Sequence, residues 1–319
     1  MKIIFSESSN LNNSVYGNCQ APIKMFLEKR GEEFEQNSVL KNLFLMGSSK
    51  NYGDVMTTLT AMSGFEPVGE NGAYPLDGMQ EGYQKFLKYQ TWKDSFSVSK
   101  EMIEDGKLLD MRKQPAAFMT SYNRTRELFG AALYGAAMMG NGSVTFKGVK
   151  FDLTGADGSN LFAKEHVPKV SGDKQCNLFK DAFSVDALGK LETKMHLFRG
   201  DNDEILDVAP DTILIPENAD LKKAVFAAIG ADKDPVSANN AFNYQYGRWN
   251  VIVWPYLNHY VTNGVSPWVL LDSKYNETYG GAVWNDRIQL EARSTIDENT
   301  DANVWRGRSR FNAAFNDWR

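Results

Sequence analysis

The sequence is poor in the residues that build disulfide frameworks and metal centres. Its 319 residues include two cysteines, Cys19 and Cys176, and three histidines. Two cysteines cannot make a disulfide framework, which favours a reducing compartment. The histidines, His166, His196 and His259, are 30 or more positions apart, and no HExxH or paired CxxC spacing is present. The sequence therefore gives almost no support to a zinc site.

Long apolar runs and a basic charge balance are also missing. No apolar run approaches the ~20 residues that span a bilayer, and the stretch 3–5 is too short for the core of a signal peptide. Lys and Arg number 35 against 40 Asp and Glu, a net charge of −5. A dedicated nucleic-acid binder shows the opposite bias. The composition, 42% hydrophobic and 24% charged, is that of a globular chain.

The usual signatures of catalysis and nucleotide binding are missing too. There is no GxGxxG after a strand, no GxxxxGK[ST] and no GxSxG. Residues 201–204 resemble the start of a calcium loop but lack its later glycine and glutamate, so a solvated turn fits better. We expect no enzyme, no cofactor and no metal. Carboxylates are plentiful, however, and the sequence alone leaves open whether two of them meet as an acid/base pair.

The first part of the chain falls into two segments of different character. Residues 1–64 contain two short helical patterns, at 22–30 and 39–46. Residues 65–98 begin with glycines and prolines and continue with aromatic residues spaced by three to four. These aromatic residues are Tyr83, Phe86, Tyr89, Trp92 and Phe96. Their spacing suits a helix, whereas their β-favouring neighbours suit strands, so both remain open. We expect an aromatic arm that packs on a partner; the plainer alternative is an insertion folded onto its own domain.

The strongest helical pattern follows. It opens at Pro115 and ends at Met139, which gives a rod of roughly 37 Å. Its first half is amphipathic, and residues 128–140 carry no charge and are rich in glycine and alanine. We therefore expect the second half to be buried in a core rather than to line a cofactor cleft. A short capped helix is expected before it, at 99–105.

A helix is expected at 185–198. Residues 200–275, which follow it, look like an α/β unit, with expected strands at 212–216, 249–255 and 267–272 and an expected helix at 218–229.

Residues 283–319 are predicted to end the chain in β structure. Arg306, Arg308 and Arg310 share one face of the last expected strand, over about 13 Å. They are able to contact phosphate or to pair with acids across the ribbon or on another subunit. The acidic balance of the chain favours the salt bridges.

Several stretches, taken in order, carry a family likeness. Residues 99–106 read SKEMIEDG, 157–166 read DGSNLFAKEH, and 206–216 read LDVAPDTILIP. Residues 249–271 hold VIVWPYL and, later, PWVLL, and the chain ends DWR at 317–319. These stretches resemble the motifs E-x-I-x-D-D, D-G-x-x-L-F-x-x-x-H, P-x-x-L-L-V-P, V-I-x-x-P-x-L … W-x-L-x and D-W-R of the major head subunit of Mu-like tailed bacteriophages.

The likeness spans roughly residues 95–319, with Gly106 in place of the second Asp of the first motif. It implies an α+β protein with the tailed-phage major capsid fold, also called the Johnson fold. The implied parts are an N-terminal arm (1–64), an extended loop reaching a neighbouring subunit (65–98), a peripheral domain (99–198 and 276–319) with a spine helix (115–139), and an axial domain (199–275).

The resemblance also implies a function. A major capsid protein self-assembles through pentamers and hexamers into an icosahedral head shell that encloses phage double-stranded DNA. Expected partners are further copies of the chain, a scaffolding protein and a portal; the DNA is held without sequence specificity, and no membrane is involved. The protein would assemble in the host bacterial cytoplasm and reside in the virion. The candidate inter-subunit contacts are Phe86, Tyr89, Trp92, Arg306, Arg308 and Trp318.

Because no scaffolding segment precedes the expected arm, we expect the scaffolding protein to be a separate chain. We expect no covalent cross-link, although Lys85 and Lys88 lie in the loop. Two alternatives stay open. One is a nanocompartment shell of the same fold, resembling an encapsulin, that encloses enzymes. The other is a soluble α/β enzyme with an unmarked site in 200–275.

Overall fold

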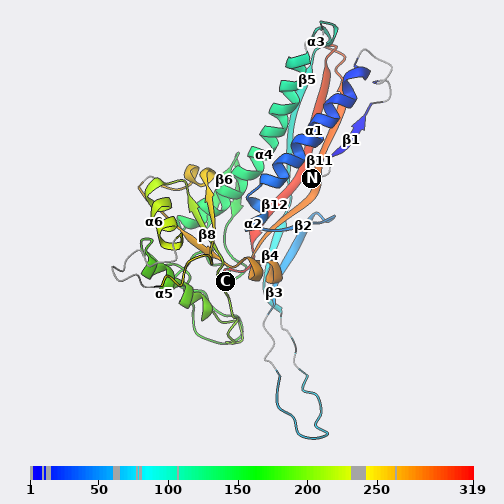
Figure 1. Cartoon of the computed structure of the whole chain (residues 1–319). Helices are drawn as coiled ribbons and strands as arrows, with labels where there is room; N and C mark the ends of the chain where they lie inside the picture. The colour runs from blue at the N-terminus through cyan, green and yellow to red at the C-terminus, as the bar shows by residue number, and fades with distance from the viewer. Residues whose placement is uncertain are drawn as a thin grey trace.

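The protein was analysed as a computed structural model. The structure describes residues 3–8, 11, 16–59, 65–76, 78, 81–105, 108–230, 242–262 and 264–319. Gly106 of the first motif lies outside them. The molecule is elongated, with a long sheet under two helices, an α/β part beside one end of the sheet, and a hairpin that projects from the same end (Figure 1).

A five-stranded sheet forms the long axis of the molecule. Its strands are β1 (Ile4–Glu7), β2 (Leu45–Ser48), β5 (Gln90–Val98), β11 (Ala282–Ile296) and β12 (Asn303–Phe315). β11 and β12 form an antiparallel ribbon, which confirms the predicted β ending. β5 pairs antiparallel with the other edge of β12, while β1 and β2 each add in parallel to β11. From Asn303 to Phe311 of β12, buried residues alternate with more exposed ones, so one face of this sheet is covered and the other is not.

Helices α1 (Gly17–Asn37) and α4 (Leu108–Met138) cover that face (Figure 1). Ile23 and Leu27 of α1 and Phe118 of α4 join Trp305 of β12 in one apolar cluster. The N-terminal segment therefore packs on its own protomer, with α1 on α4 and β1 in the sheet. α1 also extends beyond the predicted 22–30 at both ends, because packing on the sheet stabilises turns that are marginal alone.

α4 differs from its prediction at its first end. The helix begins at Leu108, so Pro115 lies inside it and does not open it. Proline removes one helical hydrogen bond, but the preceding residues, LLDMRKQ, contain no glycine or β-branched residue and hold the helical geometry. The second half is buried, as predicted. Gly130 and Gly135 leave room there for Leu40 and for Tyr260.

The α/β part contains a three-stranded sheet in the order β10-β8-β9. Its elements are α5 (Val185–His196), β8 (Thr212–Pro216), α6 (Ala219–Ile229), β9 (Asn250–Trp254), η1 (Pro255–His259), β10 (Val269–Leu271) and α7 (Ser273–Tyr279). Every strand and helix predicted between 185 and 272 is confirmed with end shifts of at most two residues. Asn218 caps α6, since its side chain accepts hydrogen bonds from the N–H groups of Asp220 and Leu221.

The aromatic segment that the sequence left ambiguous forms strands. β4 (Glu81–Lys88) pairs antiparallel with β3 (Gly53–Leu59), and together they make the projecting hairpin. β5, which follows directly, belongs to the main sheet. The outgoing strand of the hairpin thus lies before residue 65, and the returning strand ends at Lys88.

Residues 39–46 were predicted as one helix, and this is wrong. Only α2 (Leu40–Leu43) is helical, and β2 begins at Leu45 because these residues pair with β11. The remaining short elements are α3 (Lys100–Glu104), β6 (Ser143–Phe146) and β7 (Val149–Asp152). α3 starts at the predicted cap, since the Ser99 hydroxyl accepts a hydrogen bond from the Met102 N–H.

Packing of α4 on the sheet leads to a stability prediction. A Cβ at Gly307 of β12 would overlap the ring of Phe118. Gly307→Ala is therefore expected to destabilise the fold by about 1–3 kcal/mol, which lowers the thermal unfolding midpoint by several degrees. Gly69→Ala, where nothing lies within 4 Å of the new Cβ, is the matched control. Equal melting temperatures for the two variants would contradict the close approach of α4 to β12.

Candidate assembly surfaces

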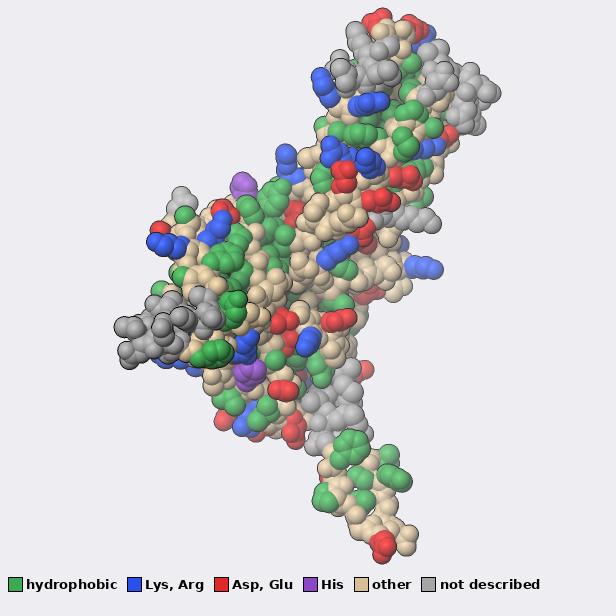
Figure 2. All heavy atoms as spheres, in the orientation of Figure 1, with side chains coloured by type: hydrophobic (Ala, Val, Ile, Leu, Met, Phe, Trp, Pro, Cys, Tyr) green, Lys and Arg blue, Asp and Glu red, His purple; other side chains and the backbone are tan. Residues whose placement is uncertain are grey.

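The projecting hairpin leaves apolar side chains without cover. Phe65, Tyr74 and Leu76 in its loop are 109%, 94% and 103% exposed. Nearer the sheet, Val55 of β3 lies opposite Phe86 of β4, and both are more than half exposed. Figure 2 shows apolar side chains gathered on the projecting loop, at the end of the molecule remote from α3. Exposed apolar groups on a projecting limb mark an interaction surface.

The root of the hairpin is fixed by Tyr89. This residue is 2% exposed, and its hydroxyl donates a hydrogen bond to Asp54 at the start of β3. Burial acts to raise the pKa of the Asp54 carboxyl, but hydrogen bonds from Tyr89, Asn51 and Ser49 outweigh burial and lower it. Tyr89 therefore anchors the hairpin to its own protomer and offers no surface to a neighbour.

Trp92 also turns inward. Its ring stacks on Phe311 at a centroid distance of 5.1 Å, and its Nε1 donates to the Phe311 carbonyl over 3.3 Å. Phe129 of α4 and Phe151 of β7 contact the other parts of the ring. Trp92 thus belongs to the main core, because the alternation of β5 points it toward α4.

Trp318 takes part in a buried cluster that joins two of the sequence motifs. Its ring stacks on His166 at a centroid distance of 4.2 Å, and the two planes differ by 10°. His166 comes from the DGxxLFxxxH stretch and Trp318 from the closing DWR. The next residue, Arg319, donates to Asp201 over 2.8 Å and to Asp317 over 3.0 Å. We call these residues, with Asp157 and Asn177, the C-terminal clasp.

Two side-chain oxygens hold the ring of His166 in place. Its Nδ1 lies 2.7 Å from an Asp157 carboxylate oxygen, and its Nε2 lies 3.1 Å from the Asn177 side-chain oxygen. The Asn177 amide nitrogen donates to the carbonyls of Leu161 and Trp318, which fixes the amide orientation. Both ring nitrogens of His166 therefore lie within hydrogen-bond distance of side-chain oxygens.

Asp157 is the buried carboxylate beside His166. Burial raises the pKa of the Asp157 carboxyl. The hydrogen bond and the charge of His166, together with the backbone N–H of Ser159, have a larger effect and lower this pKa below its ordinary value. The side chains of His166 and Asp157 are 1% and 5% exposed. The clasp is thus a buried hydrogen-bonded cluster that ties the C-terminus to the 157–177 segment.

Of the six predicted contact residues, the structure leaves Phe86, Arg306 and Arg308 exposed. Tyr89 and Trp318 are buried in the protomer and Trp92 is half-buried. Arg306 and Arg308 stand on the sheet face opposite the helices. Arg308 meets Glu291 across the ribbon at 3.5 Å. The expected cross-ribbon salt bridge is therefore present at one position.

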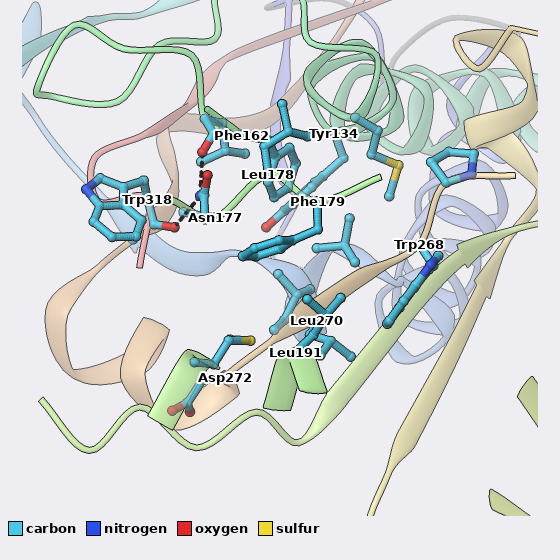
Figure 3. A pocket seen from close by; sticks show the side chains of 18 of the residues that line it. Tyr134, Phe162, Asn177, Leu178, Phe179, Leu191, Trp268, Leu270, Asp272 and Trp318 are labelled. Atoms are coloured by element: carbon cyan, nitrogen blue, oxygen red, sulfur yellow. Dashed lines mark hydrogen bonds between the residues drawn. The ribbon is translucent and has the colours of Figure 1, made fainter. Parts of the chain in front are cut away.

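A cavity of about 630 Å³ lies between α4, α5, β10 and the clasp. Phe179 and Leu191 project into it, and Asn177 binds the Trp318 carbonyl at its edge (Figure 3). Asp272, also at the edge, accepts hydrogen bonds as the cap of α7. The lining is mainly aromatic and aliphatic, and these two polar groups already have partners, so they offer no acid/base pair.

Across the part of the chain that the structure describes, no group of three or more His, Cys, Asp or Glu side chains is arranged to hold a metal ion. Within the same residues, no helix combines the length and the apolar character needed to cross a membrane.

Comparison with known proteins decides the family. A family model described as "Phage capsid protein" matches residues 83–319, about three quarters of the sequence. The chain belongs to the phage capsid protein family. It is a structural protein of the virion with the tailed-phage capsid fold, so the alternative of a soluble α/β enzyme is wrong. No curated protein matches the sequence.

Solved structures of similar shape include phage capsids and one particle from an archaeon. The capsid of Ralstonia phage GP4 has a TM-score of 0.49 and 9% identity, and the match covers 88% of each chain. The decorated capsid of bacteriophage JBD30 gives 0.47 and 14%, covering 69% of this chain and 91% of the other. A virus-like particle from Pyrococcus furiosus gives 0.46 and 10%, covering 93% and 95%.

The clasp leads to a prediction about the stability of this capsid protein. Asp157→Asn removes the buried carboxylate that pairs with His166 and with the Ser159 N–H, and we expect a loss of about 1–3 kcal/mol in the free energy of unfolding, measured by urea titration of unassembled protein with tryptophan fluorescence. Because the folded-state pKa of Asp157 is lowered, the stability it contributes is complete above its unfolded pKa of about 3.9. That stability is lost as pH falls further, so the two proteins should converge below about pH 4.

The control for this prediction breaks an exposed pair in the same segment. Glu165 lies 2.7 Å from Lys174, and both side chains are more than half exposed. Glu165→Gln is expected to leave the unfolding curve unchanged, because water screens such a pair. If Asp157→Asn behaved like Glu165→Gln, the clasp would not hold the C-terminus.

Proposed function

We propose that this capsid protein is the major head subunit of a Mu-like tailed phage, and that it builds the icosahedral shell through pentamers and hexamers. The observation that carries the proposal is the projecting hairpin. Its exposed Phe65, Tyr74 and Leu76 find no cover on their own protomer, so a neighbouring copy is the natural place for them.

Ring closure follows from the symmetry of such a contact. A limb that projects from one copy and binds a different surface of the next makes a heterologous interface, and repetition of that interface closes into rings or propagates further. Rings of five and six subunits that join edge to edge give a closed container. Each stable interface is expected to bury on the order of 1,600 Å².

The chain is proposed to divide into an extended loop, an axial domain and a peripheral domain, with boundaries placed at the ends of the observed strands. The extended loop then comprises the hairpin of β3 and β4 with the residues between them, and the axial domain comprises 199–275. The remaining elements form the peripheral domain, with α4 as its spine and the N-terminal segment packed on it.

The proposed partners are those of a head shell. They are further copies of the chain, a scaffolding protein supplied as a separate chain, a portal, and packaged double-stranded DNA bound without sequence specificity. The net charge of −5 supports a wall that adsorbs DNA weakly. Assembly would take place in the host bacterial cytoplasm.

Negative-stain electron microscopy of the protein expressed alone and with candidate scaffolding proteins tests the proposal. The expected result is rings or closed shells of megadalton mass. A protein that stays monomeric under both conditions at high concentration would overturn it. Shells that hold a defined protein cargo and no DNA during infection would favour the nanocompartment alternative.

The apolar loop provides a sharper prediction. The triple variant Phe65→Ser, Tyr74→Ser and Leu76→Ser keeps the length of the hairpin and removes its exposed apolar groups. We expect at least about tenfold fewer closed shells at the same protein concentration, because large apolar side chains dominate interface energies. The unfolding midpoint of the unassembled protein should not change, since these side chains touch little of their own protomer.

The matched control removes exposed apolar groups elsewhere. Met25, Leu197 and Phe242 are 69%, 61% and 80% exposed and belong to segments other than the hairpin. Their replacement by serine should leave the shell count close to wild type. A normal shell count for the loop variant would show that the hairpin does not join neighbouring copies.

A further inference from the structure

The cavity between α4, α5, β10 and the clasp has no part in the assembly proposed above. Its volume of about 630 Å³ falls within the range of about 300–1,000 Å³ that small-molecule sites occupy. An engineered apolar cavity of about 150 Å³ binds benzene, so this one has room for two or three rings. Close-packed interiors hold few voids larger than a water molecule. A hollow of this size is therefore more than slack in the packing of the core.

Aromatic rings form much of the cavity wall. They come from α4, from the start of β10, from the C-terminus and from the segments between them (Figure 3). These residues are Tyr134, Phe162, Phe179, Trp268 and Trp318. Met138 of α4 adds a polarisable thioether, which adapts its shape to a bound ring. Rings pair with rings by edge-to-face or offset contacts, so the wall suits a planar aromatic ligand.

The interior of the cavity offers no free charge. Five charged residues line it, namely Lys180, Asp181, Asp272, Asp317 and Arg319. Asp317 lies 3.0 Å from Arg319, and Asp272 accepts hydrogen bonds as the cap of α7. Lys180 and Asp181 are neighbours of opposite sign, and both are exposed to water. A charged ligand would lose its hydration inside the cavity without gaining an opposite charge there, so the lining favours an uncharged one.

Residues 178–182 separate the cavity from solvent. Leu178 and Phe179 line its interior (Figure 3), whereas the next three residues are exposed. The segment belongs to no helix or strand. Trp268 holds it, since its Nε1 donates to the Asp181 carbonyl over 3.2 Å. A wall without ladder hydrogen bonds opens at a lower cost than a paired strand, which gives a ligand a way in.

This wall connects the clasp to α5. Asn177 of the clasp directly precedes it and donates to the Trp318 carbonyl over 3.1 Å. Phe183 follows it and packs against Trp268 at a centroid distance of 4.9 Å, and Ser184 then caps α5. A molecule that fills the cavity thus contacts α4, the clasp and the α/β part together, and its binding stabilises the folded protomer.

We propose that the cavity binds one uncharged, planar aromatic molecule of two or three rings. The volume limits the size of this ligand, the aromatic wall selects its rings, and the paired charges of the lining exclude ions. Because the cavity lies within one protomer, the inference goes beyond the proposed function and does not depend on shell assembly.

Two fluorescent compounds with the same ring skeleton test the proposal. Phenylnaphthylamine is uncharged and has three rings, and its emission rises in an apolar site. Anilinonaphthalenesulfonate carries the same rings and a sulfonate. When each is titrated into the unassembled full-length protein, we expect one phenylnaphthylamine per protomer and at least about tenfold weaker binding of the sulfonate. Equal affinities for the two compounds would contradict the exclusion of charge.

A cavity-filling variant locates the bound molecule. Leu191 of α5 projects into the cavity (Figure 3). Leu191→Trp occupies part of the space, so phenylnaphthylamine is expected to bind at least about tenfold more weakly. The matched control is Leu197→Trp, which adds the same side chain just after α5 at a position that is 61% exposed. This control should bind the compound as wild type does.

Thermal unfolding gives a second measurement. Saturating phenylnaphthylamine is expected to raise the unfolding midpoint of wild type and of Leu197→Trp, but not that of Leu191→Trp. Circular dichroism shows whether each variant folds. If Leu191→Trp is unfolded, Leu191→Phe takes its place, with an expected loss of affinity of several-fold.

The exposed hairpin needs its own control, because it also carries apolar groups. The triple variant at Phe65, Tyr74 and Leu76 should bind phenylnaphthylamine as tightly as wild type, since these residues do not line the cavity. A loss of binding in this variant would place the compound on the hairpin and overturn the inference.

The remaining outcomes separate the inference from the proposed function. A wild-type protein that binds no phenylnaphthylamine, or binding that Leu191→Trp leaves intact, would overturn the cavity site and leave the proposed function standing. Phenylnaphthylamine bound one to one by a wild-type protein that never forms shells would support the cavity site and remove the proposed function.

Discussion

The antiparallel pairing of β5, β12 and β11 is the constraint on which the rest of the structure depends. Three long strands side by side make a sheet whose side chains alternate between two faces. α1 and α4 bury one face with Phe118 and Trp305 at its centre. The same alternation leaves Arg306 and Arg308 on the other face, so the burial of one side and the charge of the other have a single cause.

The pairing also determines where the hairpin leaves the molecule. β5 and β4 are nearly continuous, with Tyr89 between them. Because β5 is held along its length by β12 and Tyr89 is buried at the junction, the direction of β4 is set by the sheet. A limb with a rigid root suits docking on a neighbour, because less conformational freedom is lost when it binds.

The clasp completes the protomer at the same end of β12. Trp318 and Arg319 follow that strand directly, and they join the 157–177 segment and Asp201 through a stacked ring and ion pairs. The C-terminus thus links the ribbon to the start of the α/β part. In a capsid protein that must present several surfaces to its neighbours at once, such a link keeps those surfaces in a constant relation.

Local sequence patterns determined many of the helices and strands of this protein. The strand at 212–216, the helix at 218–229 and the β ending depend on residues that are close in sequence, and the structure confirms each of them. The family likeness, based on ordered motifs, led to the phage capsid family that the comparison shows. The missing motifs for metals, nucleotides and catalysis agreed with a structural protein.

Only the tertiary structure decided which residues are buried and which are exposed. Tyr89, Trp92 and Trp318 are large aromatics of the kind that anchor interfaces, and sequence alone could not tell that Asp54, Phe311 and His166 contact them from distant positions. The cations on the uncovered sheet face were equally hidden, because Lys93, Arg293 and Arg306 meet only through strand pairing. The sequence by itself thus determined single helices and strands, because these depend on neighbouring residues. The composition of the surfaces depended on which strands pair, since the pairing of β5 with β12 brings together residues some two hundred positions apart.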